Sequence, residues 1–276
     1  MTGHYCALVM RTLPTFIRSI ALVGVAVALL GANAIDRFIT TTLTQQWELF
    51  TSGSGDLAPS KKRLRFTTSG GVDPIPDPLY GASRATCFIS EFRLPRVSWT
   101  TSVDATQAIA SSALPADSEF LMYIRSVQTD FVFPLQIDYE FCMYVKVAPA
   151  ATSIGYSAFE TTTDIFGGPP VRVEVLSDEV LQPKSSKPFV GKLVYSYNPT
   201  GDLLTMKFGK QTLTIPGYMN TVLPASDIVF WQPVVGIGCS ANYEPSDPPI
   251  AIQPFNFRNF KATNLTLPGI IPDPPP

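Results

Sequence analysis

Side chains able to perform nucleophilic or metal-assisted catalysis are scarce in this sequence. The chain has 276 residues and a single histidine, His4, which precedes a long apolar segment. The part of the chain after that segment has no histidine, which excludes there a Ser-His-Asp triad, a Cys-His pair and a histidine-ligated zinc. The sequence also has no C-x-x-C, P-loop or G-x-G-x-x-G pattern. We therefore expect no cofactor, no metal site and a protein that is not an enzyme.

Two pairs of acidic residues remain as candidates for chemistry. Asp138 and Glu140 are two residues apart in a segment typical of a strand, so both side chains should project from one face. We interpret the pair as part of a polar sheet face in contact with water, and the alternative is a glycosidase pair. Asp178 and Glu179 follow another expected strand and are placed in a loop, as calcium ligands or as solvated charges.

Aromatic and basic residues supply candidate binding positions. An aromatic platform for a sugar ring is one interpretation of three residues and core packing is the other; these weak sugar-binding candidates are Tyr156, Trp231 and Tyr243. A basic cluster and one tryptophan could contact lipid headgroups or a partner protein, or simply be solvated; they are Trp47, Lys61, Lys62, Arg63 and Arg65.

Net charge and cysteine content narrow the class of protein. The formal net charge is −2, so we expect no nucleic acid as a partner. Cys87, Cys142 and Cys239 follow the apolar segment and allow at most one disulfide among them. We interpret them as free, buried side chains that pack like small hydrophobic residues, with their disulfide state left open.

The apolar segment near the N-terminus predicts a membrane anchor. No charged side chain occurs from Ser19 to Ile35, and a helix over about residues 16–39 would cross a bilayer of roughly 30 Å. Arg11 and Arg18 precede the segment, which favours a cytoplasmic N-terminus and a main domain on the periplasmic, extracellular or lumenal side. The alternative is a signal peptide cleaved after an A-x-A site ending at Ala34. The residues assigned to the anchor are Phe16, Ile17, Arg18, Ile20, Leu22, Val23, Val25, Val27, Leu29, Leu30, Ile35 and Phe38.

Composition divides the chain into four parts. Residues 1–50 form the N-terminal segment with the single transmembrane helix, and residues 51–85, which are rich in Gly, Ser and Pro, form a flexible and extended linker. Residues 86–264 form a β domain, and residues 265–276 form a Pro-rich extended tail. We therefore predict a mainly β protein with one N-terminal transmembrane helix.

The β domain is predicted from alternating side chains and turn signals. In residues 135–147 one face carries mostly apolar side chains, from Ile137 to Val147, and the other carries mixed ones, from Gln136 to Lys146. Hairpins are expected at the turn N-P-T-G-D and at Gly209. Many short strands at this spacing indicate an antiparallel β-sandwich of the jelly-roll type.

The order of several segments resembles the concanavalin A-like lectins and glucanases. These segments are VRVEVLSDE, GKLVYSYNPTGDLLTMKF and VVGIGCSANYEPSDPPIAIQPFNFRNF, and the resemblance covers about residues 120–262. It implies a concanavalin A-like jelly roll and carbohydrate binding. In the metal-binding strand of the lectins, V-E-F-D, Glu174 matches the glutamate but Leu176 replaces the aspartate, so a carboxylate ligand is lost. The E-x-D-x-x-E motif of the glucanases does not occur.

Three functions are compatible with these observations. The favoured one is a non-catalytic accessory subunit of a larger membrane protein complex, with other subunits and the lipid bilayer as partners. The alternative is a membrane-tethered or secreted carbohydrate-binding, lectin-like module. A viral jelly-roll coat protein is the third.

Overall fold

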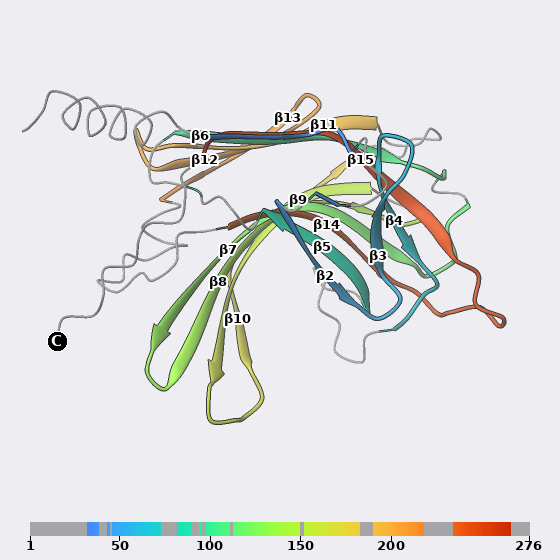
Figure 1. Cartoon of the computed structure of the whole chain (residues 1–276), viewed down its shortest axis with the longest axis horizontal. Helices are drawn as coiled ribbons and strands as arrows, with labels where there is room; N and C mark the ends of the chain where they lie inside the picture. Colours follow the sequence, from blue (N-terminus) through green and yellow to red (C-terminus); the bar gives the residue numbers. More distant parts are fainter. Residues whose placement is uncertain are drawn as a thin grey trace, which may run out of the picture.

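The computed structural model describes residues 32–38, 43–44, 46–72, 82–89, 94, 98–110, 113–149, 152–182, 190–217 and 234–265. These residues form two antiparallel sheets that face each other (Figure 1). The first sheet has the order β13-β12-β11-β6-β15-β4-β3, with β1 also paired to β15, and the second has the order β10-β9-β8-β7-β14-β5-β2. The prediction of a mainly β, antiparallel sandwich is confirmed.

The strands of the first sheet come from both halves of the chain. They are β1 (Ala32–Asp36), β3 (Asp56–Pro59), β4 (Leu64–Thr68), β6 (Trp99–Gln107), β11 (Val190–Asn198), β12 (Leu203–Phe208), β13 (Gln211–Pro216) and β15 (Ile252–Leu265). The strands of the second sheet are β2 (Trp47–Ser52), β5 (Ser83–Ile89), β7 (Glu119–Val132), β8 (Leu135–Val147), β9 (Thr152–Asp164), β10 (Val171–Gln182) and β14 (Val234–Asn242).

The core lies between the two sheets and follows the predicted alternation. In β8 the side chains of Phe141, Met143 and Val145 are fully buried and belong to the main core. The ring of Phe141 stacks on Tyr195 of the opposite sheet, with centroids 5.8 Å apart and planes 7° apart. Trp99 packs against the other side of this contact, 4.9 Å from the Tyr195 ring. An aromatic stack across the two layers therefore fixes the spacing of the sandwich.

The three cysteines of the described residues behave as the sequence predicts. Cys87, Cys142 and Cys239 are free and buried. Burial, with smaller contributions from the nearby Asp56 and Asp36, raises the pKa of the Cys87 thiol to about 12.

The N-terminal boundary of the fold corrects the predicted membrane helix. Residues 32–36 form β1, which pairs with β15, so Ile35 lies on a strand and is 58% exposed. Phe38 is buried at 1% exposure and its ring lies 6.0 Å from that of Trp47. Among the described residues no helix is long and apolar enough to span a bilayer. The remaining anchor positions, from Phe16 to Leu30, lie outside the described residues.

The segment predicted as a flexible linker is instead part of the sandwich. β2, β3 and β4 occupy most of residues 47–68, and Leu57, Leu64 and Phe66 are buried in the core. Gly55, which suggested flexibility, is required by packing, because a Cβ there would come within 2.6 Å of the backbone of Arg84. The described residues from 32 onward therefore already belong to the β domain, which the sequence placed at residues 86–264.

A buried carboxylate ties the first residues of the fold to β2. Asp36 accepts hydrogen bonds from the backbone N–H of Phe38 at 2.6 Å and from the indole N–H of Trp47 at 2.7 Å. The amide of Gln46 donates to the same carboxylate at 3.3 Å. Since Asp36 is only 8% exposed, these donors replace the water that the carboxylate has lost.

Replacing Asp36 should therefore destabilise the whole sandwich. We expect Asp36→Ala to lower the free energy of unfolding by roughly 2–4 kcal/mol, because several buried donors lose a charged acceptor together. Chemical denaturation followed by tryptophan fluorescence measures the loss, and Asp56→Ala, at an exposed position, is the matched control. Equal effects of the two substitutions would contradict this role of Asp36.

Alkaline pH should lower the free energy of unfolding, because two buried groups have raised pKa values. Burial raises the pKa of Cys87 from 9.0 and that of Tyr123 from 10.0, each to about 12. Both groups ionise more easily in the unfolded chain, so their contribution to stability is complete below about pH 9 and is lost as the pH rises toward 12. Urea denaturation at about pH 8 and about pH 10.5 should show a lower free energy of unfolding at the higher pH. Tyr123→Phe should reduce this difference, and an unchanged difference would argue against the phenol as its source.

Candidate functional site

The outer face of the seven-stranded sheet carries a groove. On β14, which lies between β5 and β7, Gly236 and Gly238 present no side chain. A Cβ at Gly236 would come within 2.7 Å of the Phe88 ring, and one at Gly238 within 2.6 Å of the Tyr123 ring. The two glycines therefore let the aromatic rings of the neighbouring strands lie close over the sheet.

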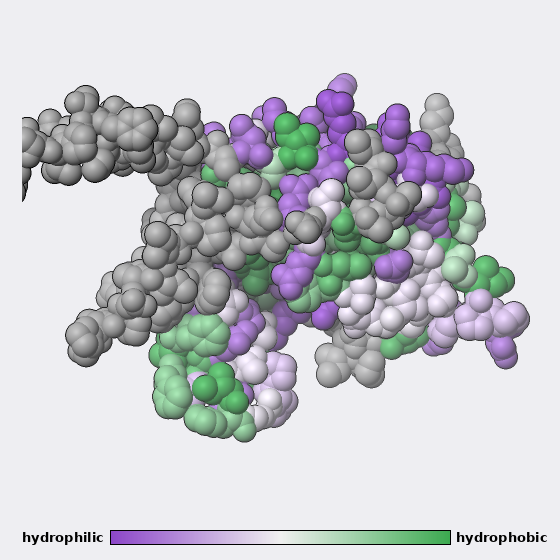
Figure 2. Space-filling model, viewed as in Figure 1, coloured by the Kyte–Doolittle hydropathy of each residue, from purple (hydrophilic) through white to green (hydrophobic). Residues whose placement is uncertain are grey.

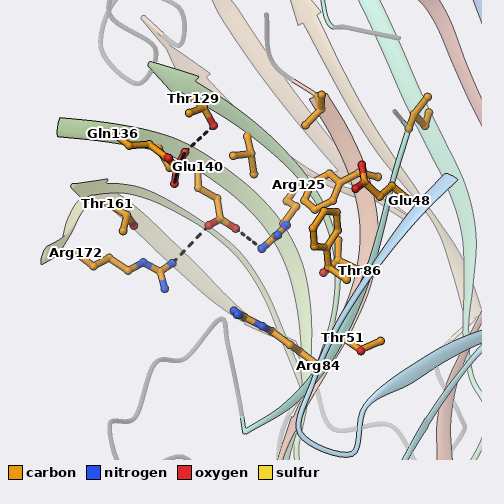
Figure 3. A pocket seen from close by; sticks show the side chains of 16 residues that line it. Glu48, Thr51, Arg84, Thr86, Arg125, Thr129, Gln136, Glu140, Thr161 and Arg172 are labelled. Carbon is orange, nitrogen blue, oxygen red and sulfur yellow. Dashed lines mark hydrogen bonds and ion pairs between the residues drawn. The ribbon is translucent and has the colours of Figure 1, made fainter. Parts of the chain in front are cut away.

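The groove has a volume of about 640 Å³ and crosses the sheet from β2 to β10. Its lining combines apolar rings and aliphatic side chains with hydroxyl, amide, carboxylate and guanidinium groups. The lining residues are Glu48, Phe50, Thr51, Arg84, Thr86, Phe88, Ile89, Arg125, Val127, Thr129, Gln136, Asp138, Glu140, Thr161, Arg172 and Val234. Figure 3 shows these side chains converging from separate strands.

An ion pair lies in the middle of the groove. Nη1 of Arg125, on β7, lies 2.8 Å from Oε1 of Glu140, on β8, and the two side chains are 13% and 10% exposed. Arg172, on β10, approaches the other oxygen of Glu140 at 3.9 Å (Figure 3). Burial lowers the pKa of Arg125, and the carboxylate compensates for part of the lost hydration of its guanidinium.

Aromatic rings hold both guanidinium groups in place. Cζ of Arg125 lies 4.6 Å from the centroid of the Phe88 ring, and Cζ of Arg172 lies 3.8 Å from that of Phe159. Cation–π contacts of this kind favour one orientation of the planar guanidinium. The central charges of the groove are therefore fixed in direction as well as in position.

The second acidic residue predicted on this face lies at one end of the groove. Oδ1 of Asp138 accepts a hydrogen bond from the Thr129 hydroxyl at 2.6 Å, and the Gln136 amide donates to both carboxylate oxygens at 3.1 and 3.2 Å. Asp138 and Glu140 therefore share the groove, as their spacing on one strand predicts. Their surroundings differ, because Glu140 faces guanidinium groups and Asp138 faces neutral donors.

Asp178 and Glu179 lie on β10 rather than in the predicted loop. Glu179 accepts from Lys146 at 2.7 Å and from the Tyr144 hydroxyl at 3.0 Å. Burial acts to raise the pKa of Glu179, but these hydrogen bonds lower it overall. The described residues contain no group of three or more His, Cys, Asp or Glu side chains placed to hold a metal ion.

Two of the three aromatic candidates for sugar binding pack as core residues, which was the other interpretation of them. Tyr156 is half-buried and stacks on Phe141 on the core side of the sheet, with centroids 5.9 Å apart. Tyr243 is 5% exposed, packs 5.4 Å from the Phe120 ring and donates its hydroxyl proton to the carbonyl of Thr68. Both side chains belong to the core, and Trp231 lies outside the described residues.

Trp47 and the basic cluster of residues 61–65, the candidates for contact with a partner or lipid headgroups, differ in their exposure in the structure. Trp47 is 7% exposed and packs against Phe260 at 4.8 Å, so it is a core residue rather than an interfacial aromatic. Lys61 and Lys62 are exposed in the turn between β3 and β4, while Arg63 and Arg65 are half-buried. Only the two lysines of this cluster are fully available to a partner.

Most groove residues were not recognised from the sequence. Phe50, which is 51% exposed, was placed in the N-terminal segment, and Arg84 at the end of the linker. The alternation of Gly236 and Gly238 in β14 is a sequence signal for the close approach of neighbouring side chains, such as the rings of Phe88 and Tyr123.

Comparisons with known proteins bear on the fold. No model of a known protein family matches the chain, and a search of curated proteins finds no match. Among solved structures, an endo-1,3-beta-glucanase from Streptomyces sioyaensis is similar, with 9% identity, a TM-score of 0.49, and coverage of 85% of this chain and 96% of that chain. Winged bean acidic lectin has 12% identity, a TM-score of 0.49, and coverage of 85% and 99%. The carbohydrate recognition domain of Emp47p has 12% identity, a TM-score of 0.44, and coverage of 86% and 98%.

These structures correct one prediction. The sequence led us to expect a protein that is not an enzyme, yet the similar solved structures include endo-1,3-beta-glucanases beside lectins. Enzymes and binding proteins both occur among them, so the expectation has no support from the fold. The resemblance inferred from the sequence is to lectins and glucanases, and proteins of both kinds are among the similar solved structures; the described residues form two facing antiparallel sheets.

Proposed function

We propose that the chain is a carbohydrate-binding, lectin-like module and that its ligand occupies the groove on the seven-stranded sheet. The observation that carries this proposal is the composition of the groove lining, in which three carboxylates and three guanidinium groups alternate with hydroxyls and an exposed ring. A neutral saccharide both donates and accepts hydrogen bonds through each hydroxyl, and its C–H faces pack on aromatic rings. The lining offers partners for each of these features.

The balance of charge favours a neutral ligand over an ionic one. The carboxylates are Glu48, Asp138 and Glu140, and the guanidinium groups are those of Arg84, Arg125 and Arg172. Their formal charges cancel, so neither a polyanion nor a polycation gains a net attraction in the groove. The carboxylate and guanidinium groups instead favour a ligand whose hydroxyls lie at positions that match them.

Phe50 is the ring best placed to contact a ligand directly. It lies on the edge strand β2, is 51% exposed, and its ring meets Phe88 edge-to-face at 5.6 Å. That contact steadies the ring while leaving part of it open to the groove. Phe88 itself is 8% exposed and serves mainly as support.

Phe50 provides the test of the groove. The similar structures suggest 1,3-β-glucan oligosaccharides and methyl-α-D-galactose as the first ligands. Titration calorimetry on the full chain in mild detergent should detect binding of at least one, and Phe50→Ala should weaken it roughly tenfold, since loss of about 1.4 kcal/mol at an aromatic contact has that effect. Phe133→Ala removes an exposed ring outside the groove and should leave the affinity unchanged.

Other outcomes of this experiment are equally informative. Equal weakening by Phe50→Ala and Phe133→Ala would move the binding site away from the groove, and no binding of a broad glycan panel would reject the proposal. Release of shorter sugars by the wild-type chain, abolished by Asp138→Asn, would identify an enzyme that uses the same groove.

We also propose that the sandwich is tethered on the extracytoplasmic side of a membrane by a single apolar segment near the N-terminus. The support is the absence of charge from Ser19 to Leu30, shortly before β1 begins at Ala32. An accessory role in a larger membrane complex stays a prediction, for which co-purification of other subunits in mild detergent is the check.

The mature mass distinguishes an anchor from a cleaved signal. Retention of the segment predicts an intact mass near 30.0 kDa. Mass spectrometry that finds a chain beginning at or near Ile35 would show cleavage and a secreted module instead.

A further inference from the structure

Two hairpins of the seven-stranded sheet extend beyond the body of the sandwich. They are formed by β7–β8 and by β9–β10, and their turns lie next to each other at the end of the projection (Figure 1). Apolar side chains are exposed at both turns and at the start of β10 (Figure 2). We call this surface the paired tips; its exposed residues are Phe131 (40%), Val132 (54%), Phe133 (80%), Ile165 (51%), Phe166 (75%), Val171 (61%) and Val173 (56%).

The two turns form one unit. The rings of Phe133 and Phe166 meet edge-to-face, with centroids 5.7 Å apart and an interplanar angle of 88°. The backbone N–H of Ile165 donates to the carbonyl of Pro134 across the two hairpins at 3.1 Å. Each turn therefore braces the other, and the apolar residues point outward together instead of collapsing onto the sheet.

The two turns of the paired tips carry no charged side chain of their own, although Asp164 and Arg172 flank them. No charged side chain occurs from Phe131 to Leu135 or from Ile165 to Val171. The carboxylate of Asp164, at the end of β9, accepts a hydrogen bond from the backbone N–H of Phe166 at 2.9 Å. The backbone carbonyl of Asp164 accepts one from the N–H of Gly167 at 3.1 Å.

Most backbone donors at the paired tips already have partners or do not exist. The N–H of Phe131 donates to the Asp130 carboxylate at 2.9 Å, and the prolines at 134, 169 and 170 have no N–H. Unsatisfied backbone groups are the main obstacle to placing a loop in lipid. The paired tips largely avoid that cost.

The shape and size of the paired tips argue against a stable protein interface. A Cβ added at Gly167 or Gly168 would meet nothing within 4 Å, so the turns stand clear of the rest of the molecule. At about 150–250 Å² for each whole aromatic side chain, the exposed parts of Phe131, Phe133 and Phe166 amount to roughly 400 Å². A stable interface buries about 800 Å² on each partner and needs a flat or complementary surface, which a narrow projection does not offer.

We propose that the paired tips insert into the interfacial layer of a lipid bilayer. A bilayer accepts a convex apolar projection without a preformed complementary surface, and aromatic residues are favoured at this depth. The groove begins directly beside the paired tips, because Gln136 pairs with Phe131 across the hairpin and Arg172 lies between Val171 and Val173 on β10. Insertion would therefore hold the groove close to the membrane surface, whether or not the groove binds a saccharide.

A tryptophan placed at the paired tips reports insertion directly. In Phe133→Trp full-length protein mixed with phosphatidylcholine vesicles, we expect the emission to shift to shorter wavelength. Since Trp47, Trp99 and Trp231 also emit, the signal is the emission that the variant adds to that of the wild type. Lipids brominated near the glycerol end of the acyl chains should quench roughly half of this added emission, since interfacial segments reach about 5–10 Å into the bilayer. Ile250→Trp, at a position 64% exposed outside the paired tips, is the matched control. It should show neither effect, even if the N-terminal segment binds the vesicles.

The remaining outcomes separate lipid from protein partners. An unchanged emission of Phe133→Trp in the presence of vesicles would overturn the proposal. A blue shift that appears without vesicles and grows with protein concentration would indicate contact with a second copy, as analytical ultracentrifugation would then confirm. Glycan titration of the same variant should be unaffected, so failure of the lipid proposal and failure of the groove proposal are distinguishable.

Discussion

The ion pair between Arg125 and Glu140 is the constraint around which the outer face of the seven-stranded sheet is arranged. A guanidinium that is 13% exposed near the centre of a sheet requires a carboxylate and a flat neighbour. The carboxylate comes from the adjacent strand, and the flat neighbour is Phe88. Phe88 in turn can lie over β14 only because Gly236 has no side chain. The buried guanidinium of Arg125 thus constrains the residues on β8, β5 and β14. Its partner Glu140 is in turn approached by Arg172 on β10.

Much of the sandwich could be predicted because the strands from β8 onward carry local sequence patterns of alternating side chains and turn residues. In β8 the apolar positions alternate from Ile137 to Val147, and the structure places that face toward the core. The hairpins of β11, β12 and β13 are fixed by local turn signals such as the positive φ of Gly201 and Gly209. These elements depend on neighbours in the sequence, which is the information that a single sequence holds.

The strands near the N-terminus were predicted wrongly, and the reason is again a physical one. β1 follows directly on the apolar run, and hydropathy alone does not distinguish the end of a membrane helix from an edge strand. The predicted helix over residues 16–39 includes Asp36, and Trp47 was a candidate for contact with lipid headgroups or a partner, whereas their hydrogen bond belongs to the core. Glycine in residues 51–58 suggested a flexible linker, but Gly55 permits close approach to β5. Both errors arose because partners distant in the sequence decide what these residues do.

The groove required the same long-range information. The face shared by Asp138 and Glu140 was predictable from one strand, but Phe50, Arg84 and Arg172 join it only through the pairing order of six other segments. Strand length then sets the geometry at its end. β7 to β10 have 12–14 residues, whereas β12 and β13 in the other sheet have 6 each, and the β7–β8 and β9–β10 hairpins extend beyond the body of the sandwich (Figure 1). The residues beyond that limit have no second layer to cover them, and for this reason a sandwich with a packed core carries an exposed apolar end beside its polar groove.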